Sequence, residues 1–270
     1  MNSTLLCCLG GILFLLSISQ AFDPKFIEND SARREFLKSF GYLTTVGAVT
    51  ATNPGLCRAA AEEDIEVYFG CGCFWHVQHE LVEAERRILG RNDVQLTSRA
   101  GYAGGKAGAL NGKVCYHNAL QVSDYGKLGH AEVVRLKIPP STFPAFAKEY
   151  FLLFNEQGYR ADQWGDKGLE YRNLVGVPGG VTSDYAKQLV QVSQENGDKL
   201  DFAKGRGDDP DARALCFVMD SNEYPFFVAE PYHQFHDGFN WGENYPGAYN
   251  DLASQLAKKN VLGESQCPRV

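Results

Sequence analysis

A short hydrophobic segment, a glycine and a cysteine stand directly before an amphipathic segment, and this order constrains the fold more than any other feature. Residues 65–69, Ile-Glu-Val-Tyr-Phe, are rich in β-branched and aromatic side chains and are followed by Gly70, which predicts a strand. After Cys73, apolar residues recur at the spacing of one helix face: Val77, Leu81, Ala84 and Ile88. We therefore predict a strand-to-helix junction with Cys73 at the start of the helix.

The other elements follow from the same two periodicities. Further strands are predicted at residues 94–100, 131–138, 173–177, 214–219 and 226–229. A second helix is predicted after Pro139-Pro140, capped by Ser141 or Thr142, with this apolar stripe: Phe143, Phe146, Ala147, Tyr150, Phe151 and Phe154. Two more helices are predicted at residues 182–195 and 250–259.

The order β-α-β-β-α of the first elements indicates the fold class. It matches a split β-α-β unit whose helices pack on one face of the sheet. We predict an α+β, ferredoxin-like two-layer sandwich with a mixed, mainly antiparallel sheet and an extended C-terminal region. Residues 101–105 are expected to form a glycine-rich turn, and the charged residues 198–211 a solvent-exposed loop.

The first 61 residues are typical of an export address. Residues 1–21 hold an apolar run that ends in small residues, as in a signal peptide, and residues 22–61 contain Arg33-Arg34, which resembles a twin-arginine signal. The Ala21-Phe22 junction resembles presequences of proteins imported into complex algal plastids, which implies a plastid and its thylakoid lumen. The alternative is one secretory signal with a disordered linker and another exported compartment. Residues 62–270 are predicted to form one domain.

Charge and composition of residues 62–270 exclude some partners. The presequence holds five of the 26 basic and four of the 33 acidic side chains, so 21 and 29 remain, a net charge of −8. A negative chain is poorly suited to bind phosphate backbones, which argues against nucleic acid. We also expect no membrane attachment in the mature form, and a monomer.

Cysteine usage indicates redox chemistry. Three of the eight cysteines lie in the presequence, which leaves Cys71, Cys73, Cys115, Cys216 and Cys267. Five is an odd number, so at least one thiol stays unpaired within a monomer. A thiol is nucleophilic as the thiolate, which the positive end of a helix stabilises, and Cys73 is placed to receive that help. Packing of Cys73, Phe74 and Trp75 in a core is the alternative.

Five motifs then occur in order along the chain. They are Gly72-Cys73-Phe74-Trp75, Gly101-Tyr102-Ala103-Gly104-Gly105, Gly129-His130-Ala131-Glu132-Val133-Val134, Asp166-Lys167-Gly168-Leu169-Glu170-Tyr171-Arg172, and Ala229-Glu230 with His233-Gln234. Together they resemble the A-type peptide methionine sulfoxide reductases, from about Val67 to Asn240. The resemblance implies reduction of methionine S-sulfoxide, free or in proteins, without a cofactor.

The resemblance also implies roles for single residues. Cys73 matches the cysteine that attacks the sulfoxide sulfur and becomes a sulfenic acid. Glu132 matches the acid that protonates the sulfoxide oxygen, for which it must itself be protonated, a state that partial burial favours. Asp166 and Tyr171 match residues that order this network. Phe74 and Trp75 match the pocket for the methyl group on sulfur.

The sulfenic acid must be reduced by a second thiol. Cys267 is the favoured resolving cysteine because the family carries such cysteines in C-terminal tails, and thioredoxin or a similar dithiol would complete the cycle. An idle tail thiol is the alternative. Cys71 is a further candidate, although a disulfide across two residues is strained. His130 is expected to make a structural hydrogen bond.

Two positions depart from the family pattern. Gln78 stands where the family has Glu, so any role of a charge is lost, and we interpret it as a structural position. The family's second active-site tyrosine lies before the Gly-His-Ala-Glu motif, where this chain is longer; Tyr116 is our substitute in substrate binding.

Two other classes of function remain open. Cys71, Cys73, His76 and His79 could bind zinc, although four ligands packed at one helix start cannot easily converge. A non-catalytic module that binds methionine-rich partners is the other alternative, motivated by Gln78 and the missing tyrosine. The preferred prediction has no metal.

Overall fold

The strand-to-helix junction around Cys73 forms as predicted. The computed structural model describes residues 63–106, 112–161, 164–237, 245–259, 262 and 267–268, so the presequence lies outside the described residues. Three residues separate the end of strand β1 (Ile65–Gly70) from the start of helix α2 (Phe74–Leu89). The inner face of α2 is apolar, with Val77, Leu81 and Ala84 fully buried, because these residues recur every three or four positions.

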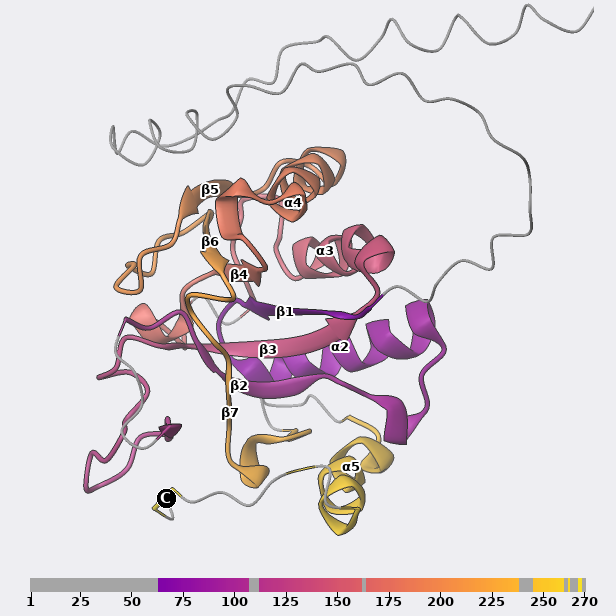
Figure 1. Cartoon of the computed structure of the whole chain (residues 1–270), viewed down its shortest axis with the longest axis vertical. Helices are drawn as coiled ribbons and strands as arrows, with labels where there is room; N and C mark the ends of the chain where they lie inside the picture. The colour runs from indigo at the N-terminus through magenta and orange to yellow at the C-terminus, as the bar shows by residue number, and fades with distance from the viewer. Residues whose placement is uncertain are drawn as a thin grey trace, which may run out of the picture.

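The described strands form one mixed sheet in the order β5-β6-β4-β1-β3-β2-β7 (Figure 1). Besides β1 they are β2 (Arg99–Ala103), β3 (Ala131–Ile138), β4 (Leu174–Val177), β5 (Asp201–Lys204), β6 (Leu215–Asp220) and β7 (Phe227–Val228). Antiparallel pairs join β1 to β3 and β4, and β2 to β3 and β7; β6 pairs in parallel with β4 and β5. The prediction of an α+β fold with a mixed, mainly antiparallel sheet is confirmed.

Three helices bury one face of this sheet. Helices α3 (Phe143–Leu152) and α4 (Asp184–Glu195) share a core with α2 and with alternate residues of the central strands. The predicted stripe from Phe143 to Phe154 is buried throughout. Helix α5 (Gly247–Lys258) packs separately, on Val82 and Leu96, at the end of the molecule opposite α4 (Figure 1). Within the described part of the chain, no helix combines the length and the apolar character needed to cross a bilayer.

The predicted strand at residues 94–100 is displaced toward the C-terminus. Residues 93–95 form a 3-10 turn, and β2 instead runs through Gly101 to Ala103, which we had predicted as a turn. The buried carboxylate of Glu85 accepts the backbone N–H groups of Thr97 and Ser98, at 2.8 and 2.6 Å, so these groups are not available to a neighbouring strand. Gly101 is needed within β2 because a Cβ atom there would collide with the carbonyl oxygen of Phe227.

Two further predictions need correction. The segment 198–211 is not wholly a loop, because β5 lies inside it and buries Phe202 against the helices. This short strand was not predicted because the segment is rich in charged residues and glycine at its ends. Thr142 is the N-cap residue of α3, but its side chain makes no capping bond to the helix and donates instead to the carbonyl of Pro139, at 2.8 Å. A 3-10 turn at residues 140–142 starts this helix in place of a capped first turn.

Candidate active site

Cys73 lies at the N-cap of α2, in extended conformation with φ −63° and ψ 123°. The chain reaches this point through Gly72, whose φ of +73° is in the left-handed region that favours glycine. The N–H of Gly72 donates to the carbonyl of Tyr171, at 3.0 Å, which joins two of the predicted motifs. Cys73 is half-buried, so its sulfur is at the positive end of a helix without being sealed in the core.

Glu132 is brought to the same helix terminus by the register of the sheet. It lies on β3 opposite Tyr102 of β2 and is 2% exposed. Its Oε2 accepts the backbone N–H of Phe74, the residue after Cys73, at 3.0 Å. Its Oε1 accepts the hydroxyl of Tyr125, at 3.2 Å. The predicted proton donor and the predicted nucleophile therefore share one end of α2.

Tyr125 is a site residue that was not predicted from the sequence. Its ring stacks on Tyr116, with centroids 5.6 Å apart, and Tyr171 is near enough for the two tyrosines to affect each other's pKa. Burial, and then the charge of Glu132, raise the pKa of all three tyrosines above the ordinary value, so their hydroxyls remain protonated donors. Tyr116 was the predicted substitute for the family's second tyrosine. Tyr125, not Tyr116, makes the hydrogen bond to Glu132. The sequence signal that could have identified Tyr125 was its position, seven residues before Glu132.

Asp166 is half-buried at the edge of the tyrosine cluster. Burial raises the pKa of its carboxyl group, while the charge of Arg160 opposes the rise. Arg160 donates to the backbone carbonyl of Asp166, at 2.6 Å, and forms an ion pair with Asp211, at 2.9 Å. Asp166 also raises the pKa values of Tyr116 and Tyr171. Its charge is therefore felt by the tyrosine cluster, and its proposed role in ordering the site stays a prediction.

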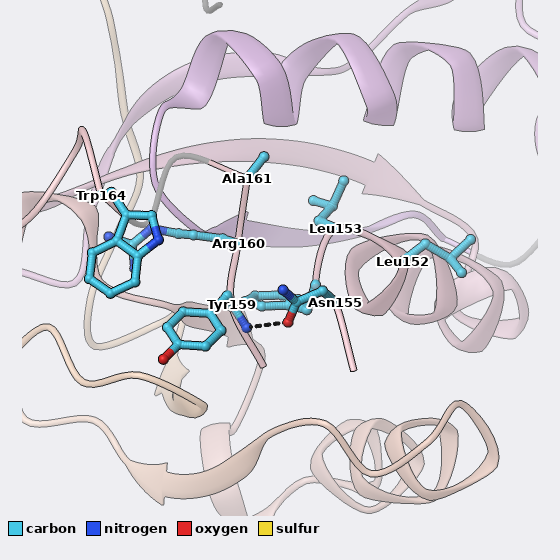
Figure 2. Close-up of a pocket in the computed structure, with 8 residues that line it drawn as sticks. Leu152, Leu153, Asn155, Tyr159, Arg160, Ala161 and Trp164 are labelled. Atoms are coloured by element: carbon cyan, nitrogen blue, oxygen red, sulfur yellow. Dashed lines mark hydrogen bonds between the residues drawn. The ribbon is translucent and has the colours of Figure 1, made fainter. Parts of the chain in front are cut away.

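Arg160 also lines a separate surface pocket (Figure 2). The lining residues are Leu152, Leu153, Phe154, Asn155, Tyr159, Arg160, Ala161 and Trp164. The backbone N–H of Tyr159 donates to Oδ1 of Asn155, at 3.0 Å, which closes the turn beneath the pocket (Figure 2). None of the predicted site residues lines it, so this pocket is distinct from the site around Cys73.

An aromatic wall stands beside Cys73. Phe74 is buried and Trp75 is half-buried, and both rings contact the imidazole of His233, with centroids 5.2 and 5.9 Å apart. Tyr116 packs on the same imidazole at 4.3 Å. Burial lowers the pKa of His233 to about 4, so the imidazole is neutral at ordinary pH. The wall is therefore apolar and uncharged. His233 was expected only as part of a motif, and its contact with the wall was not predicted.

Gln78 holds the scaffold behind this wall. Its Nε2 donates to the carbonyl of Ser98 at 3.4 Å and to Oε1 of Gln234 at 3.2 Å, and its Oε1 accepts the N–H of Phe235 at 2.6 Å. The side chain is fully buried. The interpretation of Gln78 as a structural position is confirmed. His130 likewise accepts the N–H of Gly105 through Nδ1, at 3.0 Å, as expected of a structural histidine.

The predicted resolving cysteine, Cys267, is joined in a disulfide to Cys115. Cys71, Cys73 and Cys216 carry thiols. Among the described side chains, the sulfur atoms of Cys115 and Cys267 and an oxygen of Glu230 lie within 4.8 Å of one another, but the two sulfur atoms are bonded to each other and are not thiolate ligands. Cys71, Cys73, His76 and His79 form no such group among the described residues. The zinc alternative at the start of α2 therefore has no geometric support.

Comparisons with known proteins agree with the motifs. No family model matches the chain. The peptide methionine sulfoxide reductase MsrA of Pseudomonas aeruginosa is 31% identical over 173 residues, which cover 63% of this chain and 66% of the relative. The MsrA of Yersinia pestis is 28% identical over 172 residues, 62% and 67% of the two chains. This chain thus spans about two thirds of the length of these relatives.

Solved structures in the same comparison have lower similarity. Methionine sulfoxide reductase A of Corynebacterium diphtheriae has a TM-score of 0.42 at 20% identity, over 76% of this chain and 78% of that one. Reduced Mxr1 of Saccharomyces cerevisiae has a TM-score of 0.38 at 22% identity, over 63% and 82%. The sequence relatives, and the five motifs that meet around Cys73, carry the assignment: this chain belongs to the peptide methionine sulfoxide reductase A family.

Proposed function

We propose that this protein reduces methionine S-sulfoxide to methionine, with Cys73 as the nucleophile. One observation carries the proposal: the N-terminus of α2 holds Cys73, and the buried carboxyl of Glu132 accepts the N–H of the very next residue, at 3.0 Å. A sulfur nucleophile and a proton donor are thus held within one helical turn. Family membership supports the same activity.

Cys73 and Glu132 together account for every atom and electron that the proposed reaction exchanges with the sulfoxide. The Cys73 thiolate attacks the sulfoxide sulfur while Glu132 gives its proton to the sulfoxide oxygen. Oxygen ends on the Cys73 sulfur as a sulfenic acid, and methionine leaves with its sulfur reduced by two electrons. Tyr125 holds Oε1 of Glu132 and the Phe74 N–H holds Oε2, so the carboxyl cannot rotate away from the cysteine.

The aromatic wall supports a substrate with a small apolar group on sulfur. Phe74, Trp75 and the neutral His233 form an uncharged surface beside Cys73. Moving a methyl group from water onto such a surface lowers the free energy, whereas a charged group would lose its hydration there. We propose that this wall takes the methyl group and that the phenols of Tyr116 and Tyr171 face the polar side of the sulfoxide.

A turnover assay on the two sulfur epimers tests the proposal. We expect N-acetyl-methionine amide from N-acetyl-methionine S-sulfoxide amide, and the reduced peptide from an S-sulfoxide peptide, with dithiothreitol as reductant, and no product from the R epimers. The readout is the reduced product quantified by chromatography. Absence of product from either S substrate, in a protein that gives a cooperative unfolding transition, would contradict the proposal.

A non-catalytic module that binds methionine-rich partners was suggested by Gln78 and by the missing tyrosine, and both features fit an enzyme. Gln78 bridges Ser98, Gln234 and Phe235 as a scaffold residue. A tyrosine hydrogen bond to Glu132 is present through Tyr125. The enzymatic role is therefore preferred. A dithiol such as thioredoxin is the proposed reductant.

We also propose export to a plastid, with the thylakoid lumen as destination, from the presequence alone. Residues 1–61 lie outside the described residues, so this proposal depends on the signal-peptide and twin-arginine patterns. Imaging the full-length chain with a C-terminal fluorescent tag tests it. Thylakoid signal that is lost when Arg33-Arg34 is changed to Lys-Lys, while the chain still enters the plastid, would support the second address; secretion would contradict it.

A further inference from the structure

The surface pocket at the end of α3 takes no part in the proposed reaction. Its volume of about 470 Å³ is that of a pocket for a ligand or a large side chain. Trp164 lies at one end of it and Leu152 at the other (Figure 2). These two side chains are 74% and 57% exposed, although both are large and apolar. Such a surface becomes more stable when a partner covers it.

Two cations lie over the aromatic end of this pocket. The rings of Tyr159 and Trp164 pack together, with centroids 5.7 Å apart. The guanidinium group of Arg213 lies 4.9 Å from the centre of the Tyr159 ring, and Nζ of Lys167 lies 5.5 Å from that of Trp164. Both charged side chains are exposed. The rings therefore hold two positive charges at the rim of an apolar surface.

A third cation, Arg160, lies beneath the pocket and is compensated within the fold. It is 3% exposed and donates to both carboxylate oxygens of Asp211, at 2.9 and 3.0 Å. The charges that a partner meets at this end are therefore those of Lys167 and Arg213. An acidic group beside an apolar side chain complements this surface.

The aromatic end of the pocket is also next to the candidate active site. Arg160 lines the pocket and donates to the backbone carbonyl of Asp166, at 2.6 Å. The charge of Asp166 acts on Tyr116 and Tyr171 beside Glu132. Trp164 and Asp166 are two residues apart, so their Cα atoms are at most about 7 Å apart. An extended peptide that leaves the active site, at about 3.3 Å per residue, can reach the pocket within a few residues.

We propose that this pocket binds a large apolar side chain that is followed by an acidic residue, in an extended segment of an oxidised protein a few residues from its methionine sulfoxide. The inference rests on the proposed function and deepens it, because it names a class of substrate. The apolar side chain contacts Trp164 and Tyr159, and the carboxylate of its neighbour pairs with Lys167 or Arg213. Such segments are reduced at lower concentration than free methionine sulfoxide or basic segments.

Peptides that each carry one methionine S-sulfoxide test the proposal, with dithiothreitol as reductant. One set has a Phe-Asp pair at increasing distances on either side of the sulfoxide, and a matched set has Ala-Lys at the same positions. The readout is kcat/KM for each peptide divided by that for N-acetyl-methionine S-sulfoxide amide, which is too short to reach the pocket. For at least one placement, we expect Phe-Asp to exceed Ala-Lys by about tenfold, through a lower KM.

Variants of the pocket separate its apolar and charged parts. Trp164→Ala should remove most of the advantage of the Phe-Asp peptide. Arg213→Glu should lower it by about two- to fivefold, and should raise kcat/KM for a Phe-Lys peptide. Val94→Ala, an exposed apolar change beyond the C-terminal end of α2, and Lys258→Glu, an exposed charge reversal on α5, are the matched controls and should leave the ratio unchanged.

The outcomes distinguish this inference from the proposed function. If no S-sulfoxide is reduced, the proposed function is contradicted. The pocket is then tested by calorimetry with the Phe-Asp peptide carrying norleucine in place of the sulfoxide: binding that Trp164→Ala abolishes supports the pocket, and no binding overturns it. Reduction without a Phe-Asp advantage, or an advantage that survives Trp164→Ala, overturns the pocket's role and leaves the activity standing. A dimer in sedimentation that Trp164→Ala dissociates would assign the pocket to a second copy of the chain and overturn it as well.

Discussion

Cys73 and Cys115 both belong to segments that contribute residues to the candidate active site, but different kinds of structure hold them in place. Cys73 lies between a six-residue strand and a sixteen-residue helix, at the edge of the main core. Cys115 lies in an irregular segment before β3, where its partners are a single bridge to Asp124 and the bond to Cys267. The first region is specified by local periodicity, whereas the second depends on contacts between distant parts of the chain.

This difference suggests a division of labour. The regular region places the nucleophile and the acid through the sheet register, which leaves little freedom in their separation. The irregular region brings the Cys115–Cys267 disulfide and two tyrosines against that fixed geometry. The proposed chemistry on the substrate should therefore depend mainly on residues of β3 and α2, with Tyr116 and Tyr125 of the irregular region in support.

Among the variants that test the two regions, replacing the nucleophile should have the largest effect on turnover. Cys73→Ser is expected to abolish turnover, because a serine hydroxyl at this helix terminus does not ionise and the oxygen cannot be taken up by sulfur. The measurement is methionine formed with dithiothreitol, with Cys216→Ser as a control that keeps its activity. Appreciable turnover by Cys73→Ser would remove the chemistry from the regular region altogether.

Glu132→Gln should have the next largest effect. The amide oxygen can still accept the N–H of Phe74, but the side chain no longer delivers an acidic proton. Loss of a positioned general acid lowers kcat by about 10²–10⁴-fold. Steady-state kinetics measure this, with Glu195→Gln on the exposed end of α4 as control. A change of less than threefold in kcat would mean that the proton comes from elsewhere, and the tyrosines would be the next donors to test.

The regular region is also the part that sequence reasoning predicted well. Strand β3 matches its predicted bounds, and α2 begins where the apolar spacing placed it, because both patterns are read within a few residues. Cys73 and the Phe74 N–H group that binds Glu132 therefore lie at the same end of α2, and the catalytic roles of these residues stay predictions. Asp166 and Tyr171 were predicted from the family's motifs, not from periodicity.

The irregular region could not be predicted in the same way. Tyr125 binds Glu132 because of the path of the loop before β3, which no local pattern encodes. The partner of Cys267 depends on two segments 152 residues apart, and five cysteines leave many pairings open. Strand β2 was displaced for a related reason, since Glu85 binds the backbone of Thr97 from another element.

His233 connects the two regions and should make the protein sensitive to acid. Its pKa is about 4 in the fold and near 6.5 when unfolded, so between these values the unfolded chain binds more protons and stability falls as pH falls. The difference corresponds to about 3 kcal/mol, at about 1.4 kcal/mol per pH unit. Urea unfolding from pH 7 to pH 4 should show this loss in wild type and a shallower slope in His233→Asn. Equal slopes, or a His233 that titrates above pH 6 by NMR, would contradict the assignment.

Gln78→Leu tests the stability of the regular region without changing a residue of the proposed reaction. Leucine has a similar size but leaves the buried carbonyl of Ser98 and the N–H of Phe235 without this partner. We expect a loss of about 1–3 kcal/mol in the free energy of unfolding. Gln191→Ala on the exposed face of α4 is the control and should change it by less than about 0.5 kcal/mol. An unchanged midpoint in urea for Gln78→Leu would show that Gln78 bridges nothing essential.

Tyr125→Phe and Tyr116→Phe probe where the irregular region meets the regular one, and the expected effects are the smallest. Tyr125 donates to Glu132, so its loss should act on kcat; one hydrogen bond of about 0.5–1.5 kcal/mol corresponds to roughly 2- to 12-fold. Tyr116 donates its backbone N–H to Glu230 and packs its ring on the aromatic wall. In the proposed function its hydroxyl faces the substrate, so the loss of this hydroxyl should raise KM. Both variants are measured with the same sulfoxide peptide. If kcat fell for Tyr116→Phe and not for Tyr125→Phe, Tyr116 would be the tyrosine that supports Glu132. The hydrogen bond from Tyr125 to Glu132 would then have no role in catalysis.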